Sequence, residues 1–204
     1  DPLAILVEDI SILYTRGNSK LADFETFLAE AKANPGKINV GTTSAGLEYD
    51  LIRTFAHKAG IEVNIVPYDH NPGQVITDLL GGQIDVIINE IAEMQGLLAS
   101  GDAKMMVVFA DERLEAYPDI PTTVEFGIDM TEGRKRGFMI HADTPQERKD
   151  ILENAIRKAY ESEGFRKYMS DNHLDLKEAW MGQEEAEAWL QQAVENFRAS
   201  GVGQ

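Results

Sequence analysis

A run of glycines and small hydroxyl residues is the segment of this sequence best suited to binding an anion. It reads Gly41-Thr42-Thr43-Ser44-Ala45-Gly46 and lies between a predicted strand and a predicted helix. Small side chains let backbone N–H groups approach a ligand, and the N-terminus of the following helix carries partial positive charge. The alternative is an ordinary strand-to-helix turn capped by a hydroxyl group. The residues that we expect to hold a carboxylate are Thr42, Thr43, Ser44, Ala45 and Gly46.

Two further strand ends carry polar side chains. The segment Pro67-Tyr68-Asp69-His70-Asn71-Pro72-Gly73 closes one predicted strand, and Asn89 and Glu90 follow the strand at 84–88. Ligands of open α/β sheets bind outside the carboxyl ends of the strands. We therefore expect Tyr68 and Asn89 to lie at the same sheet edge as the small-residue loop and to contact the same ligand. A proline-bounded turn with a tyrosine hydroxyl in water is the alternative for the first segment.

Catalytic and metal-binding alternatives have weaker support. Ser44 lies in a Thr-Thr-Ser-Ala-Gly context, whereas the serine elbow of α/β hydrolases has glycine at the first position, where a β-branched residue fits the tight turn poorly. No lysine follows the last glycine, so the run does not match a phosphate loop. The chain has no cysteine, and its four histidines show no paired spacing. We expect no catalytic residue, no metal and no cofactor, with a serine hydrolase that uses Ser44 as the alternative.

Composition and charge exclude several classes of partner. The chain has 204 residues, of which 43% are hydrophobic, enough to form a sizeable core at this length. Its 19 basic and 35 acidic residues give a net charge of −16. This charge argues against binding to nucleic acid or to an anionic membrane, because both kinds of binding need clustered Lys and Arg. Its apolar runs are shorter than the roughly 18 residues of a membrane span. The start, Asp1-Pro2-Leu3-Ala4, has neither an initiator methionine nor a signal-peptide pattern, so we expect a mature or trimmed chain.

Short apolar runs alternate with amphipathic helices along the first half of the chain, which is the pattern of an α/β protein. We expect a strand at 10–14 and a helix that Ser19 caps and Pro35-Gly36 ends. From 37 to 109 the order β-α-β-α-β-α-β favours a mostly parallel sheet with helices on its faces. This alternation of strands and helices ends after residue 110. The elements expected there are a solvent-exposed basic cluster at 134–136, a strand at 138–140 and helices at 145–162, 165–169 and 184–197.

Four segments occur in an order that resembles a known receptor family. They are Gly41-Thr42-Thr43-Ser44-Ala45-Gly46, Val66-Pro67-Tyr68-Asp69, Leu79-Leu80-Gly81-Gly82-Gln83-Ile84-Asp85-Val86 and Tyr117-Pro118-Asp119-Ile120-Pro121-Thr122. At these spacings they resemble the substrate-binding receptors of tripartite tricarboxylate transporters, also called the Bug or TctC family. The resemblance extends over essentially the whole chain, including Thr144-Pro145 and Gly182-Gln183-Glu184-Glu185 at the starts of two predicted helices.

The resemblance implies a non-enzymatic receptor with an α/β, periplasmic-binding-protein type II fold, in which two lobes close on a small carboxylate. It implies delivery of a di- or tricarboxylate, or a related organic acid, to membrane permease subunits. The location implied is periplasmic or extracytoplasmic, with a cell-surface anchor in a Gram-positive organism, and we expect a monomer. In such a receptor the loop at Thr42–Gly46 grips a ligand carboxylate, while Asn89 and the Tyr68 region shape the rest of the cleft between the lobes.

The chain departs from the family pattern in length and at several positions. Family members usually begin with a longer first lobe, which carries a glycine-rich loop on the other side of the ligand. We therefore expect 1–12 to be a remnant of an incomplete first lobe, 13–128 to form the α/β second lobe, and 129–204 to return to the first lobe as mainly helical structure. Asp50 and Asp69-His70-Asn71 differ from the residues usual in the family, which leaves the ligand open. A partner-docking module with a vestigial pocket is a further alternative.

Overall fold

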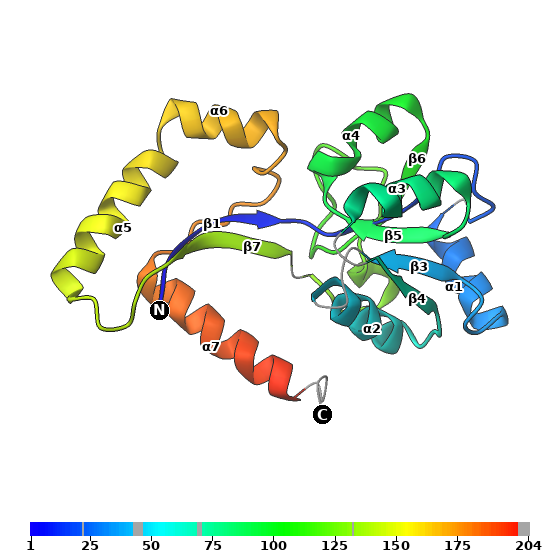
Figure 1. Ribbon diagram of the computed structural model, residues 1–204, viewed down its shortest axis with the longest axis horizontal. Helices are drawn as coiled ribbons and strands as arrows, with labels where there is room; N and C mark the ends of the chain where they lie inside the picture. Colours follow the sequence, from blue (N-terminus) through cyan, green and yellow to red (C-terminus); the bar gives the residue numbers. More distant parts are fainter. Residues whose placement is uncertain (22, 43–46, 69–70, 132, 200–204) are drawn as a thin grey trace. The chain divides into compact units, whose positions relative to one another are not determined.

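The computed structural model of the protein describes residues 1–204 apart from 22, 43–46, 69–70, 132 and 200–204 (Figure 1). The chain forms two compact units. One consists of Ile10–Gly133, and the other combines Asp1–Asp9 with Arg134–Gln204. Within the described ranges, no helix is both long enough and apolar enough to cross a membrane.

The unit Ile10–Gly133 is built on a five-stranded mixed sheet. Its strands are β2 (Ile12–Arg16), β3 (Asn39–Thr42), β4 (Asn64–Pro67), β5 (Val86–Asn89) and β6 (Ala103–Val108), in the spatial order β4-β3-β5-β2-β6. β3 runs parallel to β4 and β5, whereas β2 is antiparallel to both β5 and β6. The sequence predicts the β-α-β alternation that makes four of these strands parallel. It does not predict the insertion of β2 between β5 and β6, because strand order depends on pairing between distant segments.

Helices α1 (Phe24–Ala33), α2 (Leu47–Ala59), α3 (Pro72–Gly81) and α4 (Ile91–Ser100) follow β2, β3, β4 and β5 along the chain. The predicted cap of the first helix is wrong. Asp23 caps α1, because its Oδ1 accepts a hydrogen bond of 2.8 Å from the Thr26 N–H, and Ser19 lies in the preceding turn. α3 and α4 end at Gly82 and Gly101, each with a φ of +77°, a left-handed conformation that suits glycine.

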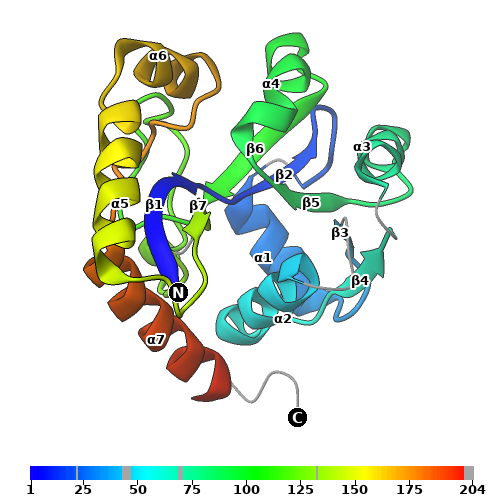
Figure 2. The same cartoon turned by 60° about the vertical axis from the view of Figure 1, so that its left-hand side comes forward.

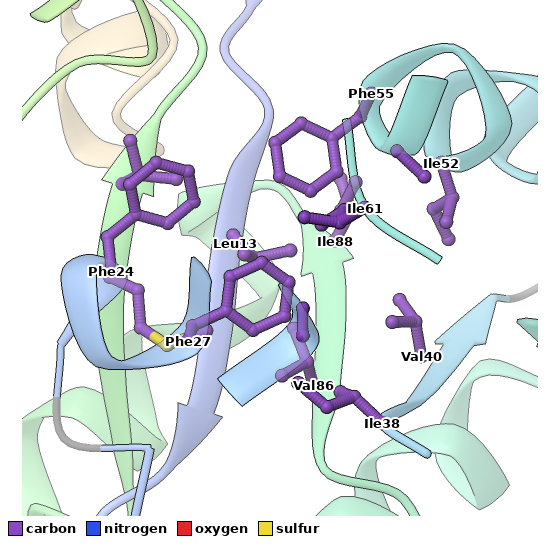
Figure 3. Packing of buried hydrophobic residues seen from close by; sticks show 14 of the residues in the cluster. Leu13, Phe24, Phe27, Ile38, Val40, Ile52, Phe55, Ile61, Val86 and Ile88 are labelled. Atoms are coloured by element: carbon purple, nitrogen blue, oxygen red, sulfur yellow. The ribbon is translucent and has the colours of Figure 1, made fainter. Parts of the chain in front are cut away.

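A hydrophobic core packs between this sheet and the helices α1 and α2 (Figure 3). Phe24 and Phe27 of α1 lie against Phe55 of α2 with ring centroids 6.1 and 6.2 Å away, and Phe55 meets Phe109 edge-on at 5.5 Å. Sheet residues of the same cluster are Leu13, Val40, Val86 and Ile88. Burying each large apolar side chain contributes about 1.5–3 kcal/mol, so this cluster holds β2, β3 and β5 in register with the helices.

The helix α3 packs closely on β3 at Gly41. A Cβ atom at Gly41 would lie 2.3 Å from Ile84 Cδ1 and 3.2 Å from Val75 Cγ1 of α3. Both side chains are buried, with 1% and 2% of their surface exposed, so they have little room to move. Glycine therefore permits the close approach of Ile84, and of Val75 in α3, immediately before Thr42.

Over its described residues, the second unit has a two-stranded antiparallel sheet and three helices. Its strands are β1 (Pro2–Asp9) and β7 (Arg134–Met139), and its helices are α5 (Gln146–Tyr160), α6 (Glu163–Asp171) and α7 (Gln183–Ala199). α5 and α7 both contact β1, as the turned view shows (Figure 2). The short 3-10 helix η1 (Val124–Phe126) belongs to the other unit.

The basic cluster at 134–136 forms part of this small sheet, and the prediction that it is solvated is wrong for Lys135 but not for Arg136, whose side chain is 49% exposed. The Lys135 side chain is only 7% exposed, and its Nζ lies 2.9 Å from Oε2 of Glu8, the residue opposite it on β1. Arg136 forms an ion pair of 2.7 Å with the buried Asp9. The expectation failed because the acidic partners lie more than a hundred residues away in the chain.

Candidate functional site

Three parallel strands end side by side at one edge of the five-stranded sheet. Thr42, the last residue of β3, pairs with the last residue of β4. On the other side of β3, Gly41 pairs with Ile87, so Asn89 at the end of β5 lies one residue beyond the level of Thr42. The Tyr68 N–H donates a hydrogen bond of 2.9 Å to the Thr42 carbonyl, which extends the ladder past β4. The predicted residues Thr42, Tyr68 and Asn89 thus lie at neighbouring strand ends.

Thr42 leads from the sheet into the small-residue loop, with 1% of its surface exposed. Its neighbours Thr43, Ser44, Ala45 and Gly46 lie outside the described residues. α2 begins directly after them at Leu47, and its first turn carries Glu48 and Asp50. The loop therefore joins a buried strand end to a helix N-terminus, where backbone N–H groups have no acceptor within the helix.

Asn89 is buried and its side chain lies against the start of α4. Asn89 is 8% exposed, and its Oδ1 accepts a hydrogen bond of 2.8 Å from the backbone N–H of Glu90. Glu90 precedes the first residue of α4 and is 6% exposed. The sequence places Glu90 at this sheet edge but does not predict it as a site residue. Its position directly after Asn89 in the sequence could have indicated Glu90 as a site residue.

The Tyr68 hydroxyl is engaged with α3. It donates a hydrogen bond of 2.6 Å to Oδ2 of Asp78, and Gln74 Nε2 donates one of 2.7 Å to the other carboxylate oxygen. Burial, and next the hydrogen bond with the Asp78 carboxylate, raise the pKa of Tyr68 to about 12. The phenol is therefore neutral at physiological pH, and its oxygen lone pairs are what it can offer to a ligand. Sequence reasoning missed Asp78, because its approach to Tyr68 depends on how α3 folds back.

The described residues contain no group of three or more His, Cys, Asp or Glu side chains arranged to hold a metal ion. The described polar side chains at the three strand ends are the hydroxyls of Thr42 and Tyr68, the carboxamide of Asn89 and the buried carboxylate of Glu90. Of these, the hydroxyl of Thr42 and the amide of Asn89 are groups that can donate to an anion.

The sequence model of the tripartite tricarboxylate transporter family receptor matches residues 1–198. The chain belongs to this receptor family. The membership confirms the resemblance that the four sequence segments indicate.

Individual relatives agree in sequence and in fold. Protein BugT of Bordetella pertussis is 25% identical over 127 residues, which cover 62% of this chain and 39% of BugT. A TctC solute-binding protein from Polaromonas is 25% identical and superposes with a TM-score of 0.77 over 94% of this chain and 65% of that one. MatC from Rhodopseudomonas palustris, solved with bound malate, is 24% identical with a TM-score of 0.74, covering 96% and 66%. These matches confirm the periplasmic-binding-protein type of fold.

The chain spans between 39% and 56% of the length of the curated relatives that it matches. The family and the matching structures are solute-binding receptors rather than enzymes. A serine hydrolase that uses Ser44 is therefore not favoured.

Proposed function

We propose that this protein is the receptor of a tripartite tricarboxylate transport system and binds a small di- or tricarboxylate where β3, β4 and β5 end. The observation that carries the proposal is the alignment of Thr42, Tyr68 and Asn89 at neighbouring parallel strand ends, each strand being followed by a helix. Family membership supports a receptor function. MatC, which has the same type of fold, holds malate, a dicarboxylate.

The ligand carboxylate is bound by donors that carry no net charge. They are the backbone N–H and hydroxyl groups of Thr42, Thr43 and Ser44, the N–H groups of Ala45 and Gly46, and the Asn89 side-chain amide. Hydrogen bonds to an ionised carboxylate are roughly twice as strong as those between neutral groups. Tyr68 contributes its ring, because its hydroxyl proton is held by Asp78 and the lone pairs that remain cannot bond an ionised carboxylate. The net charge of −16 does not prevent this, since salt screens distant charges beyond about 10 Å.

The receptor acts in the periplasm or at another extracytoplasmic location and passes its ligand to membrane permease subunits. It works as a monomer and does not bind nucleic acid. On this proposal residues 13–128 form the second lobe, and residues 1–12 and 129–204 belong to the first. The family membership of the chain supports the permease partner and the location.

Isothermal titration calorimetry of the purified chain with malate, succinate and citrate tests the proposal. At least one acid should bind, and at a hundredfold excess over its Kd it should stabilise the fold by about 2.7 kcal/mol. Thr43→Ala combined with Ser44→Ala should weaken binding at least tenfold, because each hydroxyl removed bonds a charged group. Thr77→Ala is the matched control, since this exposed hydroxyl of α3 donates to the Gly73 carbonyl. The proposal fails if no acid binds or if the control weakens binding equally.

A further inference from the structure

Asp78 combines a short hydrogen bond to Tyr68 with a negative charge that no neighbouring cation offsets. Its Oδ2 accepts the Tyr68 hydroxyl proton at 2.6 Å, and its Oδ1 accepts a hydrogen bond of 2.7 Å from Gln74 Nε2. In the part of the chain that the structure describes, no Lys, Arg or His forms an ion pair with Asp78. Asp78 lies in the last turn of α3, where the helix dipole is negative and does not compensate the carboxylate.

The backbone of Tyr68 is held at the edge of the sheet where the ligand is proposed to bind. Tyr68 directly follows β4, and its N–H donates a hydrogen bond of 2.9 Å to the Thr42 carbonyl at the end of β3. Neighbouring strands lie about 4.8 Å apart, and Tyr68 is only partly buried, so a ligand bound at the end of β3 can reach its side chain. The bond to Asp78 ties the far end of that side chain to α3.

The Tyr68 oxygen can only accept further hydrogen bonds. A tyrosine hydroxyl has one proton, and Asp78 takes it. An ionised carboxylate also only accepts, so it cannot form a hydrogen bond with this oxygen. Asp78 adds repulsion between like charges at the same place. An arrangement of this kind excludes an anionic group rather than attracting it.

We infer that Asp78 is a specificity-determining residue that keeps a further carboxylate of the ligand away from Tyr68. It acts through the Tyr68 hydroxyl and through its own charge, without touching the ligand. This inference rests on the proposed carboxylate site. With one carboxylate held at the end of β3, the carbon skeleton of the ligand lies against the Tyr68 ring. The ligand class narrows to dicarboxylates, because a compact tricarboxylate held by one carboxylate still presents two others to its surroundings.

Glutarate and tricarballylate test the inference, because they differ only by a carboxylate on the central carbon atom. Calorimetry on the purified chain should give a Kd at least tenfold lower for glutarate, since the juxtaposition of like charges is strongly unfavourable. Asp78→Ala removes the charge and releases the Tyr68 proton, which can then be donated to a carboxylate. This variant should reduce the preference for glutarate at least tenfold.

Asp102→Ala is the matched control for this substitution. Asp102 also accepts a hydroxyl proton, from Ser100 Oγ at 2.7 Å. It precedes β6, which runs in the same direction as β5 because both are antiparallel to β2, so Asp102 lies at the opposite edge of the sheet. The control removes the same charge from the chain and should leave the preference for glutarate unchanged.

The outcomes separate this inference from the proposed function. A Kd for tricarballylate equal to or below that for glutarate overturns the inference and leaves the carboxylate site intact, and so does an equal loss of preference in the control. Binding of neither acid overturns the inference, and if malate, succinate and citrate do not bind either, the proposed function fails as well. If Asp78→Ala does not fold, Asp78→Asn decides, because it keeps an acceptor for the Tyr68 proton and removes only the charge. The preference should then fall by a smaller factor, and an unchanged preference overturns the inference.

Discussion

The hydroxyl of Tyr68, at the end of β4, donates a hydrogen bond of 2.6 Å to Oδ2 of Asp78 in α3. This bond ties the end of a strand to the middle of the helix that follows it. Gln74 holds the other oxygen of the same carboxylate, so the orientation of Asp78 is determined from two sides. The bond fixes the Tyr68 ring beside α3 and has a measurable dependence on pH.

The contribution of Tyr68 to stability should disappear at high pH. Its pKa is raised to about 12, so the folded protein holds the phenol proton more tightly than the unfolded chain, where tyrosine titrates near 10. The stabilisation is complete below pH 10 and is lost as the pH rises through about 12. Tyr68→Phe should lower the free energy of unfolding by about 1 kcal/mol at pH 8. Urea unfolding at pH 8 and above pH 10 measures the difference, which should shrink at the higher pH.

Tyr117→Phe is the control for this experiment, because within the described structure the Tyr117 side chain makes no hydrogen bond. It should leave the free energy of unfolding nearly unchanged at both pH values. A Tyr68→Phe effect that stays constant to pH 12 would contradict the pH dependence.

Glu125 should titrate at an unusually low pH. The Arg113 guanidinium donates hydrogen bonds of 2.8 and 2.6 Å to its two carboxylate oxygens, and the Thr122 N–H donates one of 3.0 Å. The Arg113 hydrogen bonds first, and then the Thr122 N–H, lower the pKa of Glu125 to about 2. The stabilisation is therefore present above pH 4.5 and is lost as the pH falls through about 2. NMR titration of the carboxyl carbon should show Arg113→Gln raising this pKa, and an unchanged midpoint would refute the assignment.

Gly41→Ala should destabilise the fold because Ile84, which lies between α3 and β5, and Val75 of α3 pack closely on β3 at this position. The added Cβ would lie 2.3 Å from Ile84 Cδ1, and relieving this overlap should cost about 1–3 kcal/mol. Gly96→Ala is a matched substitution inside α4, where nothing lies within 4 Å of the added atom. It should stabilise the protein by up to about 1 kcal/mol through helix propensity. Thermal unfolding compares the stability of the two variants. A change of the same sign in both would show that the close packing at Gly41 does not determine the effect of an added methyl group.

The buried ion pair between Glu8 and Lys135 should show strong coupling in a double-mutant cycle. The side chains of Glu8 and Lys135 are 5% and 7% exposed, so Lys135→Met takes a cation away from a buried carboxylate, which keeps its ion pair of 3.2 Å with Lys177. We expect each single change, Glu8→Gln or Lys135→Met, to cost about 3 kcal/mol. The double substitution should cost clearly less than the two together, since no buried charge is then left unpaired in this pair. Additive costs in urea unfolding would indicate that water reaches the pair.

Much of the fold could be predicted from the sequence because its signals are local. The alternation of apolar runs with amphipathic segments from 37 to 109 predicted β3 to β6 and the helices between them. Gly82 and Gly101 end their helices as expected, since the left-handed conformation after a helix is a local property of glycine. The parallel crossover rule then predicted that Thr42, Tyr68 and Asn89 would lie at one sheet edge.

The first part of the chain was harder to predict. The strand at 10–14 lies at Ile12–Arg16, the helix cap is Asp23 rather than Ser19, and β1 (Pro2–Asp9) was not predicted as a strand. β1 pairs with β7, more than a hundred residues later in the chain. No local pattern reports such a pairing, and this separation also explains why Lys135 was expected in solvent.

The sequence by itself determined the family, the α/β class and the three strand ends at which a ligand is proposed to bind. Only the tertiary structure decided the order β4-β3-β5-β2-β6, the bond of Tyr68 to Asp78 and the orientation of the Asn89 amide. The physical reason is range. Helix caps, turns and hydrophobic periodicity arise among residues a few positions apart, whereas strand order and side-chain hydrogen bonds depend on which distant segments pack together.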